Sequence, residues 1–87
     1  MKKPNFSDDT KLGALNKADW CCEECRSNNA LSCHHRKPNT VPNRNKYGDN
    51  IQRIENLVIL CEDCHSEGSV KKKWKIDRET LDEWKII

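Results

Sequence analysis

Two short cysteine pairs constrain the fold of this 87-residue chain more than any other feature of its sequence. Cys22 and Cys25 are separated by two residues, as are Cys61 and Cys64, and 35 residues lie between the pairs. Two residues between cysteines form a tight turn, or knuckle, that places both sulfur atoms on one side. Two knuckles complete a tetrahedral site of four sulfurs that suits zinc. We therefore expect these four cysteines to bind a structural Zn²⁺ ion.

Other uses of paired cysteines are disfavoured. A redox-active pair needs a strand-and-helix context that the sequence lacks. Lys2 and Lys3 are followed by no apolar segment, so we expect no secretory signal and a cytoplasmic protein whose thiols stay reduced. The longest apolar run, Leu57 to Cys61, is far shorter than the roughly 20 residues of a membrane span, so no membrane partner is expected.

Two further cysteines have less obvious uses. Cys21 adjoins the first pair and is an alternative ligand to Cys22, but three residues between Cys21 and Cys25 do not form a knuckle. Cys33 lies next to two histidines, where a small buried thiol is the simpler interpretation. Any role of Cys21 or Cys33 stays open.

The apolar content is low for a folded domain. Six Leu, six Ile, three Val and one Phe make 16 of 87 residues, about 18%, and a share below about 20% is typical of disorder when the net charge is also high. Here the net charge is only +2. A metal site can supply the stability that so small a core lacks, so we predict a single, small α+β zinc-stabilised domain.

The sequence also predicts where the main elements lie. Ser7 can cap a helix from about Asp8 to Lys17, and a cysteine-rich turn from Trp20 to Cys25 leads to a short strand from Leu31 to His35. Residues 38–50 have the composition of a long loop. Residues 56–60 form a buried segment. A helical turn or two follows Cys64 and ends around Trp74. Asp77 can cap a last helix, from Arg78 to about Lys85, with Leu81 and Trp84 on one side.

The three histidines all lie close to this cysteine framework. His34 and His35 are consecutive on the predicted strand, and His65 directly follows Cys64. Consecutive residues of a strand point to opposite sides, so His34 and His35 can have different tasks. An isolated histidine in such a place is usually a polar surface residue. Three together beside two knuckles favour a functional site.

The combined pattern resembles the zinc-containing, four-cysteine branch of the HNH endonuclease family. The matching pieces are Cys22-x-x-Cys25, His34-His35, Glu55-Asn56-Leu57 and Leu60-Cys61-x-x-Cys64-His65. The resemblance covers roughly residues 20–72 and implies a ββα-metal, treble-clef-like core with flanking N- and C-terminal helices. We therefore expect an N-terminal helical extension (1–19), the zinc-stabilised core (20–76) and a C-terminal helix (77–87).

The resemblance also implies the roles of individual residues in cleaving DNA. His35 matches the general base, His34 and His65 match the ligands of a catalytic divalent cation, and Asn56 matches the asparagine that braces the loop and orients the base. An imidazole titrates near neutrality and can take a proton from water. Mg²⁺, Mn²⁺ or Ni²⁺ can stabilise the charge on the reacting phosphate.

The chain departs from the family pattern at several positions. The family often has an acidic residue at the position of His34, an aliphatic residue at that of Arg36, and a Gly-Gly turn where this chain has residues 42–45, Pro-Asn-Arg-Asn. A histidine at position 34 also occurs in the family, so metal binding is still expected. The altered loop affects the expected substrate geometry.

Basic residues gather in the middle of the sequence. Residues 30–60 carry five basic and two acidic side chains, a surplus of three, and we expect the basic ones to contact DNA phosphates. They are Arg36, Lys37, Arg44, Lys46 and Arg53. A second group, Lys71, Lys72, Lys73 and Lys75, has two interpretations, phosphate contact or a solvated helix end. Trp74 and Trp84 are expected in the core rather than stacked on bases.

Two alternatives to a nuclease stay open on the sequence. One is a catalytically inactive zinc module that binds nucleic acid or protein, and the other is a second structural metal held by all three histidines. The sequence also leaves open whether the substrate is single- or double-stranded. It leaves open, too, whether the protein forms a homodimer or takes part in a larger phage or defence assembly.

Overall fold

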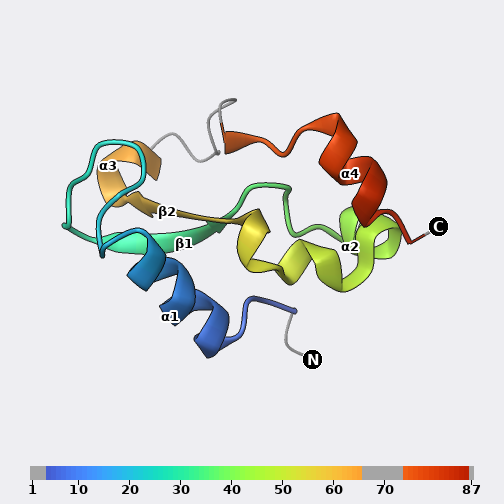
Figure 1. The fold of residues 1–87 in the computed structure, drawn as a ribbon, viewed down its shortest axis with the longest axis horizontal. Coiled ribbons are helices and arrows are strands. Elements are labelled where there is room, and N and C mark those ends of the chain that lie inside the picture. Colours follow the sequence, from blue (N-terminus) through green and yellow to red (C-terminus); the bar gives the residue numbers. More distant parts are fainter. Residues whose placement is uncertain (1–3, 66–73, 87) are drawn as a thin grey trace.

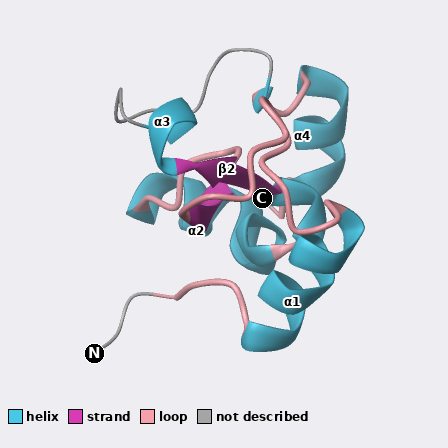
Figure 2. Ribbon diagram, turned by 90° about the vertical axis from the view of Figure 1, so that its left-hand side faces the viewer, coloured by secondary structure: helices cyan, strands magenta, loops and turns pink. Residues whose placement is uncertain are grey.

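The computed structural model of the chain describes residues 4–65 and 74–86 (Figure 1). The elements, with η for a 3-10 helix, are α1 (Asp8–Lys17), β1 (Leu31–His35), α2 (Val41–Tyr47), η1 (Gly48–Gln52), η2 (Ile54–Asn56), β2 (Leu57–Cys61), α3 (Glu62–His65) and α4 (Arg78–Trp84). β1 and β2 pair antiparallel, with Leu31 opposite Cys61 and His35 opposite Leu57. Figure 2 shows these two strands in the middle of the molecule with helices around them. The predicted small α+β domain is confirmed.

The first helix begins and ends where the sequence predicts. The Ser7 hydroxyl accepts a hydrogen bond from the backbone N–H of Thr10 at 3.1 Å, which caps α1. Ala14 is buried within α1, and Ala18 is buried just after it. Both alanines pack with Leu57 and Ile59 of β2, and Figure 1 shows α1 running below the strand pair.

The second strand is buried on both faces. All five residues of β2 are buried, which confirms the predicted buried segment. Leu57 and Ile59 pack with Phe6 and with the alanines of α1, whereas Val58 and Leu60 pack against Cys22 on the other side. A strand covered on both faces needs a continuous apolar run, and residues 57–60 supply it.

The prediction of a long loop at residues 38–50 is wrong, because this segment contains α2 and part of η1. Thr40 caps α2 by accepting the N–H of Asn43 at 3.4 Å, and Pro42 lies in the first turn, where its missing N–H costs nothing. Gly48, with a φ of +59°, ends the helix. The same residues that suggest a loop by composition therefore mark the two ends of a short helix.

The C-terminal helix is also confirmed, one residue shorter than predicted. Asp77 occupies the N-cap position, although its side chain makes no capping hydrogen bond. Trp84 is buried with Tyr47 and Ile51, and Leu81 packs against this group. The helical turn predicted between Cys64 and Trp74 falls almost entirely on residues 66–73, which lie outside the described part; α3 (Glu62–His65) directly precedes them. Among the described residues, no helix has the length and apolar character needed to cross a membrane.

Candidate metal centre and active site

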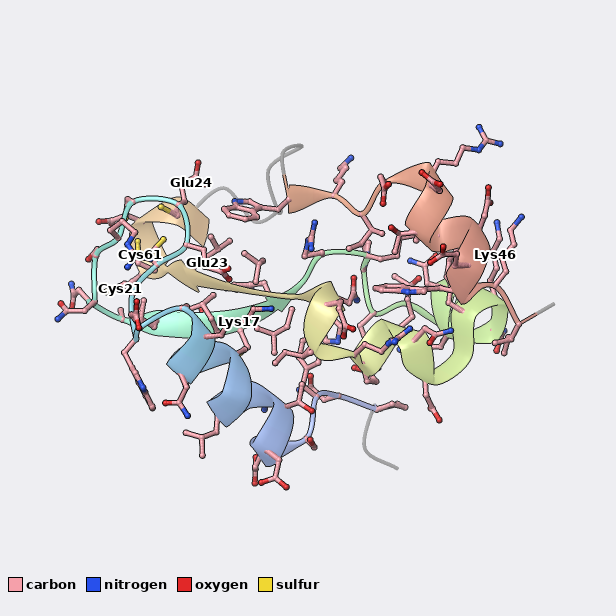
Figure 3. The ribbon with its side chains drawn as sticks, in the orientation of Figure 1. Lys17, Cys21, Glu23, Glu24, Lys46 and Cys61 are labelled. Atoms are coloured by element: carbon pink, nitrogen blue, oxygen red, sulfur yellow. The ribbon has the colours of Figure 1, made fainter. Side chains whose placement is uncertain are left out.

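The four knuckle cysteines come together at one end of the strand pair. Their sulfur atoms all lie within 4.8 Å of one another, and the Sγ–Sγ distances are 3.6 Å for Cys22–Cys64 and 3.5 Å for Cys25–Cys61. Zinc–sulfur bonds of about 2.3 Å in a tetrahedron place the sulfurs about 3.8 Å apart. The sulfur arrangement therefore fits a zinc ion. Figure 3 shows the sulfurs gathered near Cys61, beside α3.

The backbone around the cluster favours a thiolate at Cys22. Burial acts to raise the pKa of this thiol, but backbone hydrogen bonds from Cys25, Cys61 and Glu24 outweigh burial and lower the pKa to about 6. Burial and the neighbouring sulfurs raise the pKa of Cys64. Several thiolates repel one another in such a small space, and a divalent cation offsets that repulsion.

The other two cysteines lie outside the cluster. The Cys21 thiol donates to the backbone carbonyl of Asp19 at 3.3 Å. Cys33 is half-buried against the apolar residues between α1 and the strands, and burial raises the pKa of its thiol. The structure thus brings Cys22, and not Cys21, to the sulfur site.

Glu23 joins the first knuckle to the outer edge of β2. Its backbone N–H donates to the carbonyl of Ile59 at 2.9 Å, and its carboxylate accepts the N–H of Ile59 at 2.7 Å. These two bonds pair the N–H and the carbonyl of Ile59 at the edge of the two-stranded sheet, as a neighbouring strand would do. Figure 3 shows Glu23 and Glu24 next to Cys61 at this end of the molecule.

His34 and His35 contact different parts of the molecule. Nε2 of His34 lies 2.7 Å from the hydroxyl of Ser32, two residues earlier in β1. Nε2 of His35 lies 2.7 Å from Oε1 of Gln52, and the His35 ring stacks on Phe6 with centroids 4.0 Å apart and planes inclined by 13°. His35 is therefore held both at a ring face and at a ring nitrogen.

Asn56 is fully buried beside the segment that leaves β1. Its Oδ1 accepts the N–H of Lys37 at 2.7 Å, while Nδ2 donates to the carbonyls of Lys37 at 3.1 Å and Ile51 at 2.7 Å. The backbone carbonyl of Asn56 accepts the N–H of Arg36 at 2.7 Å. The structure thus brings Asn56 to the residues that directly follow His35. The fourth predicted site residue, His65, ends α3, and its side chain lies outside what the structure describes.

Two of the predicted DNA-contacting arginines are tied to the protein's own backbone. Arg36 donates through Nε to the carbonyl of Trp74 at 2.6 Å and through Nη1 to that of Glu55 at 3.0 Å. Nη1 of Arg44 donates to both the backbone carbonyl and Oδ1 of Asn39, at 2.9 and 3.0 Å. Arg36 therefore ties the end of β1 to η2 and to Trp74, and Arg44 ties α2 to Asn39.

The remaining basic residues lie around buried aromatic rings. The ammonium groups of Lys37 and Lys46 lie 5.9 and 5.6 Å from the ring centroid of Tyr47. The guanidinium of Arg53 lies 5.6 Å from the ring centroid of Trp84, a cation–π distance. In Figure 3, Lys46 lies at the end of the molecule opposite Cys61. In the second basic group Lys75 is exposed, and residues 71–73 lie outside the described part.

A groove of about 350 Å³ runs between α4 and the residues around η2. Two arginines face it, but so do three carboxylates, and the titratable residues that line it are Arg36, Arg53, Glu55, Asp77 and Glu83. The carboxylates would repel a phosphate, so this groove is a poor place for a nucleic-acid backbone.

A model of the HNH endonuclease family matches residues 22–71, which is more than half of the chain. The chain belongs to the HNH endonuclease family. The matched HNH segment contains both cysteine pairs, all three histidines and Asn56, so the predicted resemblance is confirmed. The four-cysteine cluster is consistent with the zinc-containing branch of the family. Comparison with curated proteins and with solved structures gives no match.

Sequence reasoning missed three residues that surround His35. Phe6 stacks on its ring, Gln52 bonds to its nitrogen, and Asn39 bonds to Gln52. Phe6 precedes the first helix and lies outside the matched HNH segment. No spacing rule connects these residues to a histidine, because chain folding alone brings them together.

Proposed function

We propose that this HNH protein is a metal-dependent endonuclease that hydrolyses DNA phosphodiester bonds. The observation that carries the proposal is the arrangement at the end of β1. There the family's His35 leads into a segment whose backbone N–H and carbonyl at Lys37 are both bonded to the buried Asn56. Such bonding to a buried amide fixes the backbone that follows the histidine, as a preorganised catalytic site needs.

His35 is the proposed general base. Its imidazole takes a proton from water, and the oxygen of that water attacks the phosphorus atom. Asn56 is the proposed bracing residue, since it fixes the chain directly after His35. The half-buried position of His35 limits the orientations that its ring can adopt.

His34 and His65 are the proposed ligands of one divalent cation. When bound, the cation supplies positive charge for the phosphate oxygens and the leaving oxygen. Imidazole nitrogen suits Ni²⁺ better than Mg²⁺, which prefers oxygen ligands. We therefore expect higher activity with Ni²⁺ than with Mg²⁺. His34→Asp, which introduces the acidic residue frequent in the family, should move this preference toward Mg²⁺ and Mn²⁺.

The four cysteines hold the proposed structural zinc. Closed all-sulfur sites have no open position for water, so this zinc stabilises the fold and does no chemistry. Of the five proposed DNA-contacting residues, the exposed Lys46 and the half-buried Lys37 are the best placed, because Arg36 and Arg44 already bond to backbone carbonyls. Arg53 already forms a salt bridge with Glu55 at 3.7 Å.

The test is cleavage of supercoiled plasmid and of defined single- and double-stranded DNA, with Mg²⁺, Mn²⁺ or Ni²⁺ and with no added metal. The wild type should cleave only with a metal, and His35→Ala should lose at least about 100-fold in rate while keeping its zinc and its circular dichroism spectrum. Full activity of His35→Ala would overturn the proposed mechanism. Metal-independent DNA binding without cleavage by the wild type would favour the inactive zinc module.

A further inference from the structure

A chain of side-chain hydrogen bonds leads away from His35. Nε2 of His35 lies 2.7 Å from Oε1 of Gln52, and Nε2 of Gln52 donates to Oδ1 of Asn39 at 3.0 Å. Asn39 is fixed from two directions. Its Oδ1 accepts from Nη1 of Arg44 at 3.0 Å, and its Nδ2 donates to the backbone carbonyl of Pro4 at 2.7 Å.

The two outer partners determine the direction of every bond in this chain. A guanidinium can only donate and a backbone carbonyl can only accept. Asn39 must therefore turn Oδ1 toward Arg44 and Nδ2 toward Pro4, which settles the orientation of its amide. Gln52 meets that same Oδ1, so it must approach with its NH₂ group and turn Oε1 toward His35. A carbonyl oxygen accepts only, so Nε2 of His35 has to carry a hydrogen.

We propose that Gln52 is a positioning residue that holds the neutral His35 imidazole in its Nε2–H form, so that Nδ1 is the nitrogen that accepts the proton from water. This inference rests on the proposed role of His35 as general base. In the step, an O–H bond of water breaks and an Nδ1–H bond forms, and the electron pair left on oxygen makes the new bond to phosphorus. The bond from phosphorus to the leaving ester oxygen breaks, and that oxygen leaves with the electron pair and takes a proton from solvent water. The resulting imidazolium keeps Nε2–H donating to Gln52, a bond that strengthens as the ring becomes positive.

Phe6 complements this arrangement by fixing the plane of the ring. The two rings are nearly parallel, and Phe6 is itself buried among residues of α1 and β2. The stack resists rotation of the imidazole out of its plane, while the Gln52 bond resists rotation within it. Together the two contacts define both the position and the proton-bearing nitrogen of His35.

The structural test is ¹⁵N NMR of the histidine rings in the full-length, zinc-loaded protein without a catalytic metal. Wild-type His35, in its neutral form, should show a protonated Nε2 and an unprotonated Nδ1. Gln52→Leu, similar in size but without polar atoms, should lose this preference and give a mixture. The matched control is Asn39→Asp, which still accepts from Gln52 and Arg44 and should keep the wild-type pattern. A protonated Nδ1 in the wild type, or an unchanged pattern in Gln52→Leu, overturns the proposal.

The catalytic test compares the same variants in DNA cleavage. Gln52→Leu should lower kcat by about 10- to 100-fold with little change in KM, because the contact acts on the base and not on DNA binding. Unchanged kcat in Gln52→Leu, with the mixed tautomers seen by NMR, also overturns the proposal. If the wild type fails to cleave DNA under all metals, the proposed nuclease function fails. The NMR result still decides whether Gln52 sets the tautomer.

Discussion

The two ends of the strand pair are held together by different means. At one end, which we call the cysteine end, Cys22, Cys25, Cys61 and Cys64 gather their sulfurs within 4.8 Å of one another. At the other, the aromatic end, Tyr47 and Trp84 pack with Ile51. β1 and β2 are each five residues long and span about 13 Å, and the aromatic end lies beyond them, at α2 and α4 (Figure 1). The His35–Asn56 arrangement lies toward the aromatic end.

The cysteine end shows how a small chain can fold with few apolar residues. The proposed zinc needs only four short side chains to hold the cysteine end, whereas the aromatic end needs large rings and specific bonds between distant segments. Nδ2 of Asn50 donates to the carbonyl of Trp84 at 2.6 Å, and the N–H of Ile86 donates to the carbonyl of Lys46 at 2.9 Å. The proposed general base His35 and its bracing residue Asn56 therefore depend on packing and hydrogen bonds and not on the cysteine cluster.

The largest effect is expected at the cysteine end, from two adjacent cysteines. Cys22→Ser should lose zinc and unfold, because structural zinc contributes about 10 kcal/mol or more to folding in small modules. Cys21→Ser is the matched control and should keep one zinc per chain, since its thiol lies outside the cluster. Zinc content by mass spectrometry and circular dichroism measure both. Loss of zinc from Cys21→Ser with retention in Cys22→Ser would reverse the ligand assignment.

A smaller effect is expected from removing the buried Trp84 ring at the aromatic end. Trp84→Ala removes a buried side chain and should lower the free energy of unfolding by about 3–5 kcal/mol, without changing the zinc content. Hydrogen exchange should show lost protection in α2 while the amides of β2 stay protected. The control, Val41→Ala, changes an exposed residue of α2 and should shift stability by less than about 0.5 kcal/mol. Loss of zinc from Trp84→Ala would show that the two ends are not independent.

Asn56 lies at the junction of η2 and β2, and its removal should have an intermediate effect. Asn56→Ala leaves the N–H and carbonyl of Lys37 and the carbonyl of Ile51 without their partner, at a cost of about 2–4 kcal/mol. Asn56→Asp restores an acceptor for Lys37 but no donor for the two carbonyls. Urea unfolding measures both variants. Wild-type stability in Asn56→Asp would contradict the donor role of the amide.

The smallest effect is expected from the edge of β2 at the cysteine end. Glu23→Ala removes the acceptor for the N–H of Ile59 and should cost about 1 kcal/mol, because water can partly replace this exposed carboxylate. Glu23→Gln keeps an acceptor oxygen and should stay within about 0.5 kcal/mol of the wild type. Thermal unfolding of the zinc-loaded variants distinguishes the two. A larger loss in Glu23→Gln than in Glu23→Ala would refute the edge-bonding role.

Much of the fold could be predicted from local patterns. The capped helix from Asp8 to Lys17, the strand from Leu31 to His35 and the buried run after Asn56 depend on neighbouring residues, and all three are confirmed. The same reasoning failed for residues 38–50. Polar and proline-rich composition suggested a loop, but Tyr47 anchors a helix there by packing on Trp84, far along the chain.

The candidate site also combines features that short spacing predicts with contacts that only folding creates. Cysteine spacing determined the sulfur cluster, because two residues between thiols fix a knuckle wherever the chain runs. The histidines and Asn56 were identified by the family pattern, which carries residue types but not their contacts. Arg36 illustrates the limit. Its charge suggested a phosphate contact, while the structure directs it to the carbonyls of Trp74 and Glu55.

Local sequence patterns are enough to specify the four-cysteine cluster, the family and the residues available for chemistry. Each of these depends on residue type and short spacing, and neither depends on how the chain packs. Which side chains surround His35 depends on the tertiary structure, because Phe6 comes from well before His35 in the chain and Gln52 from well after it. Hydrogen bonds and ring stacking depend on angstrom-scale placement. That placement is fixed when the helices, the strands and the sulfur cluster come together.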